Sequence, residues 1–149
     1  FLPFGPELTF LQLSNISFDA STLEIWGALL NGGRLVLQPQ LKPTLLEITN
    51  TIREKGVTTG WFTAGLFNVL VDEHVDRLRG LRHILTGGDV LSVPHVKKAL
   101  KVLGPGVLIN GYGPTENTTF TCCYPIDDEK AIKGSVPIGK AIHHTRVHV

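Results

Sequence analysis

The chain has 149 residues, a formal net charge of +1 and 42% hydrophobic residues, which is enough apolar content for one globular core. Its 14 Lys and Arg residues are scattered and form no basic stripe, so we expect no nucleic-acid partner. No apolar run approaches the roughly 18 residues that a membrane span needs, so we expect no membrane partner. These bounds favour a soluble protein that acts on small molecules.

The ends of the chain and its cysteines suggest that it is part of a longer protein and that its environment is reducing. The chain begins at Phe1, contains no Met, has no signal-peptide pattern and stops at TRVHV, inside an expected strand. We interpret it as an excerpt from a longer polypeptide. Cys122 and Cys123 are adjacent, which suits neither an ordinary disulfide nor a zinc site, so a reducing cytoplasm fits best.

Short β-rich runs alternate with helical periods from the beginning of the chain. Residues 9–14 (TFLQLS) and 34–38 (RLVLQ) are expected strands. Between them, Ser21 and Glu24 have capping-box spacing, which predicts a helix that begins at Ser21. Three large apolar residues recur on one face of that helix: Leu23, Trp26 and Leu30.

The same alternation continues to residue 110. The spacing of Leu45, Ile48 and Ile52 predicts a second helix, ended by Gly56. The remaining expected elements are strands at 57–62, 82–86 and 106–110, a short helix over 66–71 that includes Phe67 as a packing residue, and a helix capped by Ser92.

Apolar strands separated by amphipathic helices predict an α/β fold, with a mostly parallel sheet and helices on both faces. In such sheets, ligands bind outside the carboxyl ends of the strands. Three segments fall at such ends: residues 17–21 (SFDAS), 86–89 (TGGD) and 110–116 (NGYGPTE). We expect them to line one crevice.

The segment NGYGPTE combines a tight backbone with directional polar groups. Its glycines allow close approach of a ligand, and Tyr112 offers a flat face for a base. Thr115 offers a hydroxyl for a phosphate oxygen, and Glu116 a carboxylate for magnesium. These groups suit a nucleotide, although a Gly-Pro turn around a buried tyrosine would explain the same letters, and the residues alone leave both interpretations open.

Three stretches together resemble a known family. SFDASTLEIWGALLNGGRLVL (17–37), NGYGPTE and SVPIGKAIHHTRVHV (135–149) closely resemble, in order and spacing, the motifs of nonribosomal peptide synthetase adenylation domains. These domains belong to the acyl-adenylate-forming, AMP-binding ligases. The resemblance implies activation of a carboxylic acid with ATP and magnesium, followed by transfer to a phosphopantetheine thiol. The implied partners are an amino-acid substrate and the peptidyl carrier and condensation domains of the same synthetase.

The resemblance also implies roles for residues of the nucleotide site. Asn110 and Tyr112 would hold adenine, Thr115 would contact phosphate and Glu116 would bind magnesium. The backbone of Gly87 and Gly88 would lie beside the nucleotide.

The same resemblance makes residues 1–149 a partial adenylation domain, the central slice of the large N-terminal subdomain. The phosphate loop of the family would precede Phe1, and its ribose-binding aspartate, C-terminal subdomain and catalytic lysine would follow Val149. No catalytic residue is therefore expected within the chain, and the isolated chain is expected to be inactive.

Asp19 has two interpretations. A carboxylate here could simply favour the positive end of the helix dipole, which is worth a few tenths to about 1 kcal/mol. The resemblance instead implies that Asp19 binds the α-ammonium group of an amino acid. Relatives that activate acids without an α-amino group generally do not have this aspartate. The alternatives are an acyl- or aryl-CoA ligase type of adenylate-forming enzyme and a structural module without catalysis.

Alignment to the family motifs also implies a set of residues that line the amino-acid pocket: Asp19, Ala20, Leu23, Trp61, Leu85, Gly87, Gly111, Thr119 and Phe120. Apart from Asp19 this lining is apolar with one hydroxyl, which disfavours a charged or amide side chain. The combination also resembles pocket signatures associated with valine in this family, so we expect valine, or a similar aliphatic amino acid, as substrate. The position of Trp61 depends on the register of GWFTAGLF, and a slip of a few residues would place Gly65 in the lining instead.

Overall fold

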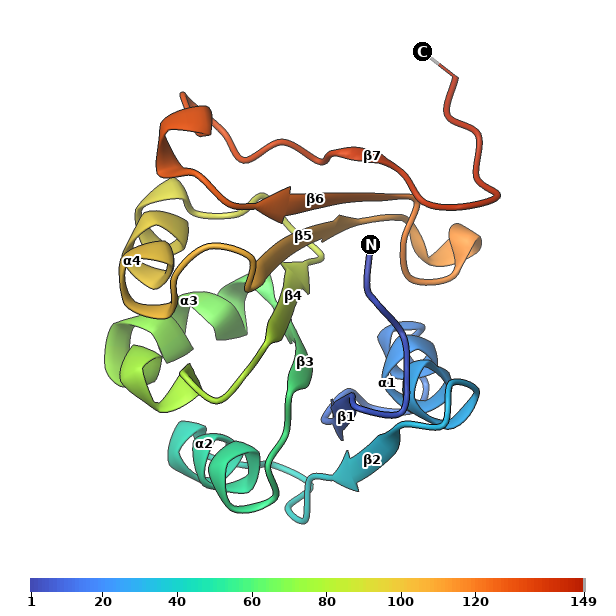
Figure 1. Ribbon diagram of the computed structural model, residues 1–149, viewed down its shortest axis with the longest axis vertical. Coiled ribbons are helices and arrows are strands. Elements are labelled where there is room, and N and C mark those ends of the chain that lie inside the picture. The colour runs from blue at the N-terminus through green and yellow to red at the C-terminus, as the bar shows by residue number, and fades with distance from the viewer. Residues whose placement is uncertain (149) are drawn as a thin grey trace.

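The computed structural model describes residues 1–148, which form one sheet flanked by helices (Figure 1). The strands are β1 (Thr9–Gln12), β2 (Arg34–Leu37), β3 (Thr59–Thr63), β4 (His83–Gly87), β5 (Leu108–Tyr112), β6 (Cys122–Ile126) and β7 (Lys140–Ala141). The helices are α1 (Ala20–Leu29), α2 (Leu45–Glu54), α3 (Ala64–His74) and α4 (Val93–Leu103), with short 3-10 helices η1 (Val75–Leu78), η2 (Thr115–Asn117) and η3 (Glu129–Ala131). Each element expected before residue 110 is present, with ends that differ by a few residues.

The seven strands lie in the order β2-β1-β3-β4-β5-β6-β7. Strands β1 to β5 are parallel to one another, and β6 and β7 are antiparallel additions at one edge. The predicted α/β fold with a mostly parallel sheet is confirmed. The antiparallel pair was not predicted, since Pro125 interrupts the strand signal of β6. β7 pairs only with Cys122 and Cys123, so Pro125 lies beyond that pairing.

Helices cover both faces of the sheet, as predicted (Figure 1). On one face, α2, α3 and α4 pack against Phe62, Ile84 and Leu108, all three completely buried. On the other face, α1 lies over β1, β2 and β3, and a second core cluster contains the neighbouring residues of the same strands, Trp61, Leu85 and Ile109. This division follows from the two-residue period of a strand, which sends successive side chains to opposite faces.

The orientation of α1 differs from the prediction. Its buried residues are small or polar, namely Ala20, Ser21, Glu24, Gly27 and Ala28. The expected apolar face is wrong, because Trp26 is 51% exposed and Leu30 is 75% exposed. A Cβ added at Gly27 would lie 3.1 Å from the ring of Phe10, so only small residues let α1 lie this close to β1.

The expected capping box of α1 is also wrong. Asp19 occupies the N-cap position without a side-chain cap hydrogen bond, and the Ser21 hydroxyl donates to the Phe18 carbonyl at 2.7 Å. A capping box exists instead at α2, where the Thr44 hydroxyl accepts from the Glu47 amide and the Glu47 carboxylate accepts from the Thr44 amide.

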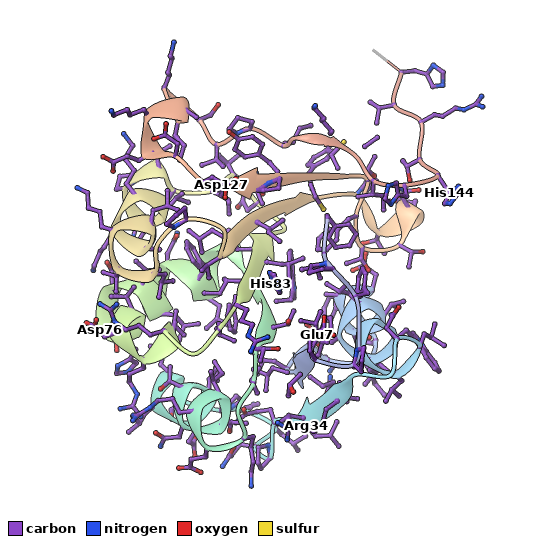
Figure 2. The ribbon with its side chains drawn as sticks, viewed as in Figure 1. Glu7, Arg34, Asp76, His83, Asp127 and His144 are labelled. Carbon is purple, nitrogen blue, oxygen red and sulfur yellow. The ribbon has the colours of Figure 1, made fainter. Side chains whose placement is uncertain are left out.

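At the amino edge of the sheet, opposite the predicted crevice, several charged or titratable side chains lie near the strand ends, among them His83, Glu7 and Asp127 (Figure 2). Burial and the nearby Arg82 lower the pKa of His83 at the start of β4, and Glu7 partly opposes this shift. The Asp127 carboxylate accepts from the Gly106 amide at 3.0 Å, which closes the loop before β5.

The end of the chain also departs from expectation. Residues 145–148 form no strand, and Val149 lies outside the described residues. None of the helices formed by residues 1–148 has the length and apolar character required to cross a bilayer.

Candidate functional site

The three segments predicted to meet do lie together at the carboxyl edge of the sheet. A hollow of about 220 Å³ is lined by residues from all three segments, from β3 and from the loop after η2: Asp19, Ala20, Trp61, Gly88, Gly111, Gly113, Pro114, Thr115 and Thr119. A second hollow of about 440 Å³ is lined by Gly88, Asp89, Val90, Leu91, Asn110, Gly111, Tyr112, Gly113, Ser135, Val136 and Ile138. The two hollows share Gly88, Gly111 and Gly113 and therefore adjoin each other.

Asp19 is fixed in the smaller hollow by a residue 100 positions away in the chain. The Thr119 amide donates to Oδ2 of Asp19 at 3.0 Å, and the Thr119 hydroxyl donates to the Asp19 carbonyl at 2.8 Å. Thr119 has a φ of 71° and Thr118 a φ of 50°, an unfavourable backbone for threonine. The loop after η2 therefore has a strained backbone, and it is in this conformation that Thr119 contacts Asp19 at the start of α1.

An aromatic pair lies beside this carboxylate. The rings of Trp61 and Phe120 are 5.2 Å apart between centroids, and both residues are buried. A Cβ added at Gly111 would lie 2.3 Å from the Phe120 ring, so this ring covers Gly111 closely. The smaller hollow thus combines one carboxylate with an apolar, aromatic wall.

The structure separates the predicted pocket residues into two groups. Asp19, Ala20, Trp61, Gly111 and Thr119 line the smaller hollow directly. The other four lie outside its lining. Leu23, Phe120 and the fully buried Leu85 pack in the core on this face of the sheet, and Gly87 is the last residue of β4.

The alternative register, with Gly65 in the lining, has no counterpart in the geometry. Gly65 is exposed in the first turn of α3, and nothing lies within 4 Å of an added Cβ. It lines neither of the two adjoining hollows, whereas Trp61 lines the smaller one.

The larger hollow contains the residues predicted for a base. Tyr112 is 48% exposed, so the alternative of a Gly-Pro turn around a buried tyrosine does not apply. Asn110 is buried, and its Nδ2 donates to the Pro137 carbonyl at 2.8 Å. Part of the Asn110 amide is therefore committed to holding the segment 135–138 beside β5.

The predicted phosphate and magnesium residues begin η2. Thr115 and Glu116 are both exposed, and Thr115 also lines the smaller hollow. Within residues 1–148, no group of three His, Cys, Asp or Glu side chains could hold a metal ion. A lone carboxylate such as Glu116 fits magnesium only where phosphate oxygens and water supply the other ligands.

Two other titratable groups near this region have strongly raised pKa values. Glu24, which was expected to take part in a capping box, is 1% exposed, and burial raises the pKa of its carboxyl to about 7. Burial also raises the pKa of the Cys123 thiol to about 12, so it is not adapted to act as a thiolate nucleophile. The burial of Glu24 could have been predicted from its position four residues after Ala20 and three before Gly27, which places it on the small-residue face of the helix.

This chain belongs to the AMP-binding enzyme family, because the family model with that description matches residues 2–149. Within the family, it is similar to parts of large peptide synthetases. It is 56% identical over 147 residues to a linear gramicidin synthase protein of Brevibacillus parabrevis, a match that covers 99% of this chain and 2% of that protein. It is 41% identical over 152 residues to surfactin synthase subunit 3 of Bacillus subtilis (strain 168), a match that covers 100% of this chain and 12% of that protein.

Solved structures agree with this assignment. The structure of holo-PA1221, an NRPS protein containing adenylation and PCP domains bound to a vinylsulfonamide inhibitor, has a TM-score of 0.88 and 54% identity, over 94% of this chain and 24% of that chain. The N-terminal subdomain of Klebsiella oxytoca NpsA in complex with anthranilyl-AMSN has a TM-score of 0.85 and 30% identity, over 93% of this chain and 36% of that chain. The predicted resemblance to nonribosomal peptide synthetase adenylation domains, and to their N-terminal subdomain, is confirmed.

Proposed function

We propose that this chain forms the amino-acid pocket and part of the ATP site of a larger adenylation domain, which converts an amino acid and ATP to an aminoacyl adenylate and pyrophosphate. The observation that carries the proposal is the pair of adjoining hollows. One contains the carboxylate of Asp19 beside an aromatic wall, and the other contains the open ring of Tyr112. The glycines that line both hollows let two ligands approach each other closely.

The smaller hollow is the proposed amino-acid pocket. One oxygen of Asp19 accepts from the Thr119 amide, which orients the carboxylate to receive an α-ammonium group. The side chain of the substrate would face Trp61, whose ring packs against Phe120, and a charged or amide group there would lose its hydration without a partner. A short aliphatic side chain, with valine first, is therefore the proposed substrate class.

The larger hollow is the proposed site for the adenine of ATP. The ring of Tyr112 would stack on the base, beside the buried Asn110, whose second N–H and carbonyl oxygen are available for hydrogen bonds. Gly87 and Gly88 would lie along the nucleotide, with Thr115 on a phosphate oxygen and Glu116 on magnesium. Magnesium, when bound, neutralises charge on the transferring phosphate.

The proposed chemistry is in-line attack of the amino-acid carboxylate on the α-phosphate of ATP. The contribution of this chain is positioning: it holds the carboxylate and the phosphate in adjoining hollows and needs no covalent nucleophile. The phosphopantetheine thiol of a peptidyl carrier domain would then attack the acyl carbon and form a thioester, with release of AMP, and a condensation domain would be a further partner. Such a multidomain protein fits relatives in which this length of chain is a small share of a long polypeptide.

An acyl- or aryl-activating enzyme is the alternative within the same family. Amino-acid-dependent exchange of pyrophosphate into ATP, measured on the intact protein with amino acids, benzoates and fatty acids, distinguishes the two. We expect exchange with valine, weaker exchange with isoleucine and leucine, and none with acids that lack an α-amino group. Preference for such acids would contradict the proposal, and a folded protein without exchange would favour a structural module.

A further inference from the structure

Glu24 is a buried acid whose side chain accepts hydrogen bonds from one short segment, Leu13 and Ser14. It lies in the second turn of α1 and is 1% exposed. Its Oε2 accepts from the amides of Leu13 at 3.2 Å and Ser14 at 3.0 Å, and its Oε1 accepts from the Ser14 hydroxyl at 2.9 Å. One carboxylate therefore holds the point where the chain leaves β1.

The segment held in this way leads directly to Asp19. After Ser14, the chain turns through residues 15–18 and enters α1 with Asp19 at the N-cap. The Phe18 amide donates to the Asn15 carbonyl at 2.9 Å, and the Ser21 hydroxyl donates to the Phe18 carbonyl at 2.7 Å. The turn is therefore braced internally, and its first residues are fixed by Glu24.

An apolar residue could not replace these contacts. A buried carboxylate is costly, as the pKa of about 7 for Glu24 indicates, with burial as the main cause and the Ser14 hydrogen bonds opposing it. Without the carboxylate, however, the amides of Leu13 and Ser14 would lose their partner beneath α1. The arrangement thus costs some stability and in return fixes the course of the turn.

We infer that Glu24 is a positioning residue for the amino-acid pocket: by holding Leu13 and Ser14, it fixes the turn that delivers the carboxylate of Asp19 to the smaller hollow. This inference rests on the proposed function of Asp19. It assigns Glu24 no contact with substrate. Loss of Glu24 should therefore impair recognition of the amino acid while leaving the nucleotide hollow, which is built on β4 and β5, intact.

The test compares Glu24→Ala, Glu24→Gln and the control Glu47→Ala in the intact adenylation protein. Glu47 is the matched control because its carboxylate also accepts a hydrogen bond from a backbone amide, that of Thr44 in the capping box of α2. Pyrophosphate exchange gives KM for valine, KM for ATP and kcat separately, and thermal unfolding is measured for each variant. For Glu24→Ala we expect KM for valine to rise by about tenfold or more, as the loss of two or more hydrogen bonds predicts, with KM for ATP within about twofold of the wild type.

Glu24→Gln should recover most of the affinity for valine, because its amide oxygen still accepts from the Leu13–Ser14 amides. Glu47→Ala should lower thermal stability without a change in either KM. The inference is overturned if Glu24→Ala leaves KM for valine unchanged, or if both KM values rise together. Should Glu24→Ala fail to fold, the decision rests on Ser14→Ala, which removes the hydroxyl hydrogen bond to Oε1 of Glu24. A KM for valine at least about twofold above wild type with KM for ATP unchanged supports the inference, and any other result overturns it.

The proposed function can fail separately. If the wild-type protein activates benzoates or fatty acids and no amino acid, the proposed function is wrong whatever the Glu24 variants do. If the wild type activates valine and the Glu24 variants show no selective change in KM, only the role of Glu24 is wrong.

Discussion

The two faces of the sheet are packed with different kinds of side chains. The face under α2, α3 and α4 is filled with large, fully buried side chains such as Phe67, Leu70 and Ile84. The face under α1 has small helix residues, an aromatic pair and the buried carboxylate of Glu24. Both hollows of the candidate site open at the carboxyl edge, and the smaller one is bounded by the α1 side.

The difference shows how one sheet can provide both stability and a binding site. Close packing of large side chains leaves no space for a ligand, whereas the carboxyl edge beside α1 leaves a hollow in which hydrogen bonds from Thr119 hold Asp19. We therefore expect substitutions on the first face to change stability mainly and substitutions on the second to change recognition mainly.

The largest expected effect is on the first face. Phe67→Ala should lower the free energy of unfolding of the intact domain by about 3–5 kcal/mol, because the ring is completely buried and leaves a cavity. The control Val69→Ala, on the exposed side of the same helix, should cost less than about 1 kcal/mol. Denaturant unfolding measures both, and equal costs would contradict the assignment of that face as the main core.

Asp19→Ala should give the largest loss of activity. Removal of one partner of a buried ion pair costs about 3–5 kcal/mol, so kcat/KM for the amino acid should fall by roughly two to three orders of magnitude. KM for ATP should stay nearly constant. The control Asp76→Ala removes an exposed carboxylate paired with Arg79, away from the site (Figure 2). Normal activation of amino acids by Asp19→Ala would refute the ammonium-binding role.

Gly87→Ala tests the close approach of β4 and β5 at the crevice. An added Cβ would lie 2.0 Å from the Gly111 carbonyl oxygen, so the strands must separate, at a cost of about 1–3 kcal/mol or more. Gly65→Ala meets nothing within 4 Å and lies in a helix, so it should raise stability by about 0.5–1 kcal/mol. Thermal unfolding compares them, and a Gly87→Ala protein as stable as wild type would contradict the close contact.

Trp61→Gly should give the most specific effect, a change in the order of preference among substrates. If the indole forms the floor of the pocket, its removal should shift preference toward leucine or phenylalanine by about 1–3 kcal/mol in relative kcat/KM. Trp26→Ala, which removes the other tryptophan from the exposed face of α1, should leave the preference order unchanged. An unchanged order in Trp61→Gly would mean that Trp61 is core packing, and the valine proposal would lose its main physical support.

Local sequence was sufficient for the type and order of most elements. Alternation of apolar strands with helical periods predicted the parallel α/β sheet, because secondary structure and burial share these periods. It also predicted that SFDAS, TGGD and NGYGPTE would meet, since the carboxyl ends of parallel strands lie at one edge. The antiparallel β6 was missed, because a strand with Pro125 has no clear local signal.

The sequence by itself therefore determined the class of fold, the family, and the edge of the sheet where the three motif segments of the candidate site meet. Tertiary structure decided which face of α1 is buried, since only small residues fit against Phe10. It also turned Glu24 inward, away from the capping box that its spacing suggested, and brought Thr119 to Asp19. Spacing along a chain fixes which residues share a helix face, but the partner that a face or a carboxylate finds depends on residues far away in the sequence, and only the packed molecule brings these together.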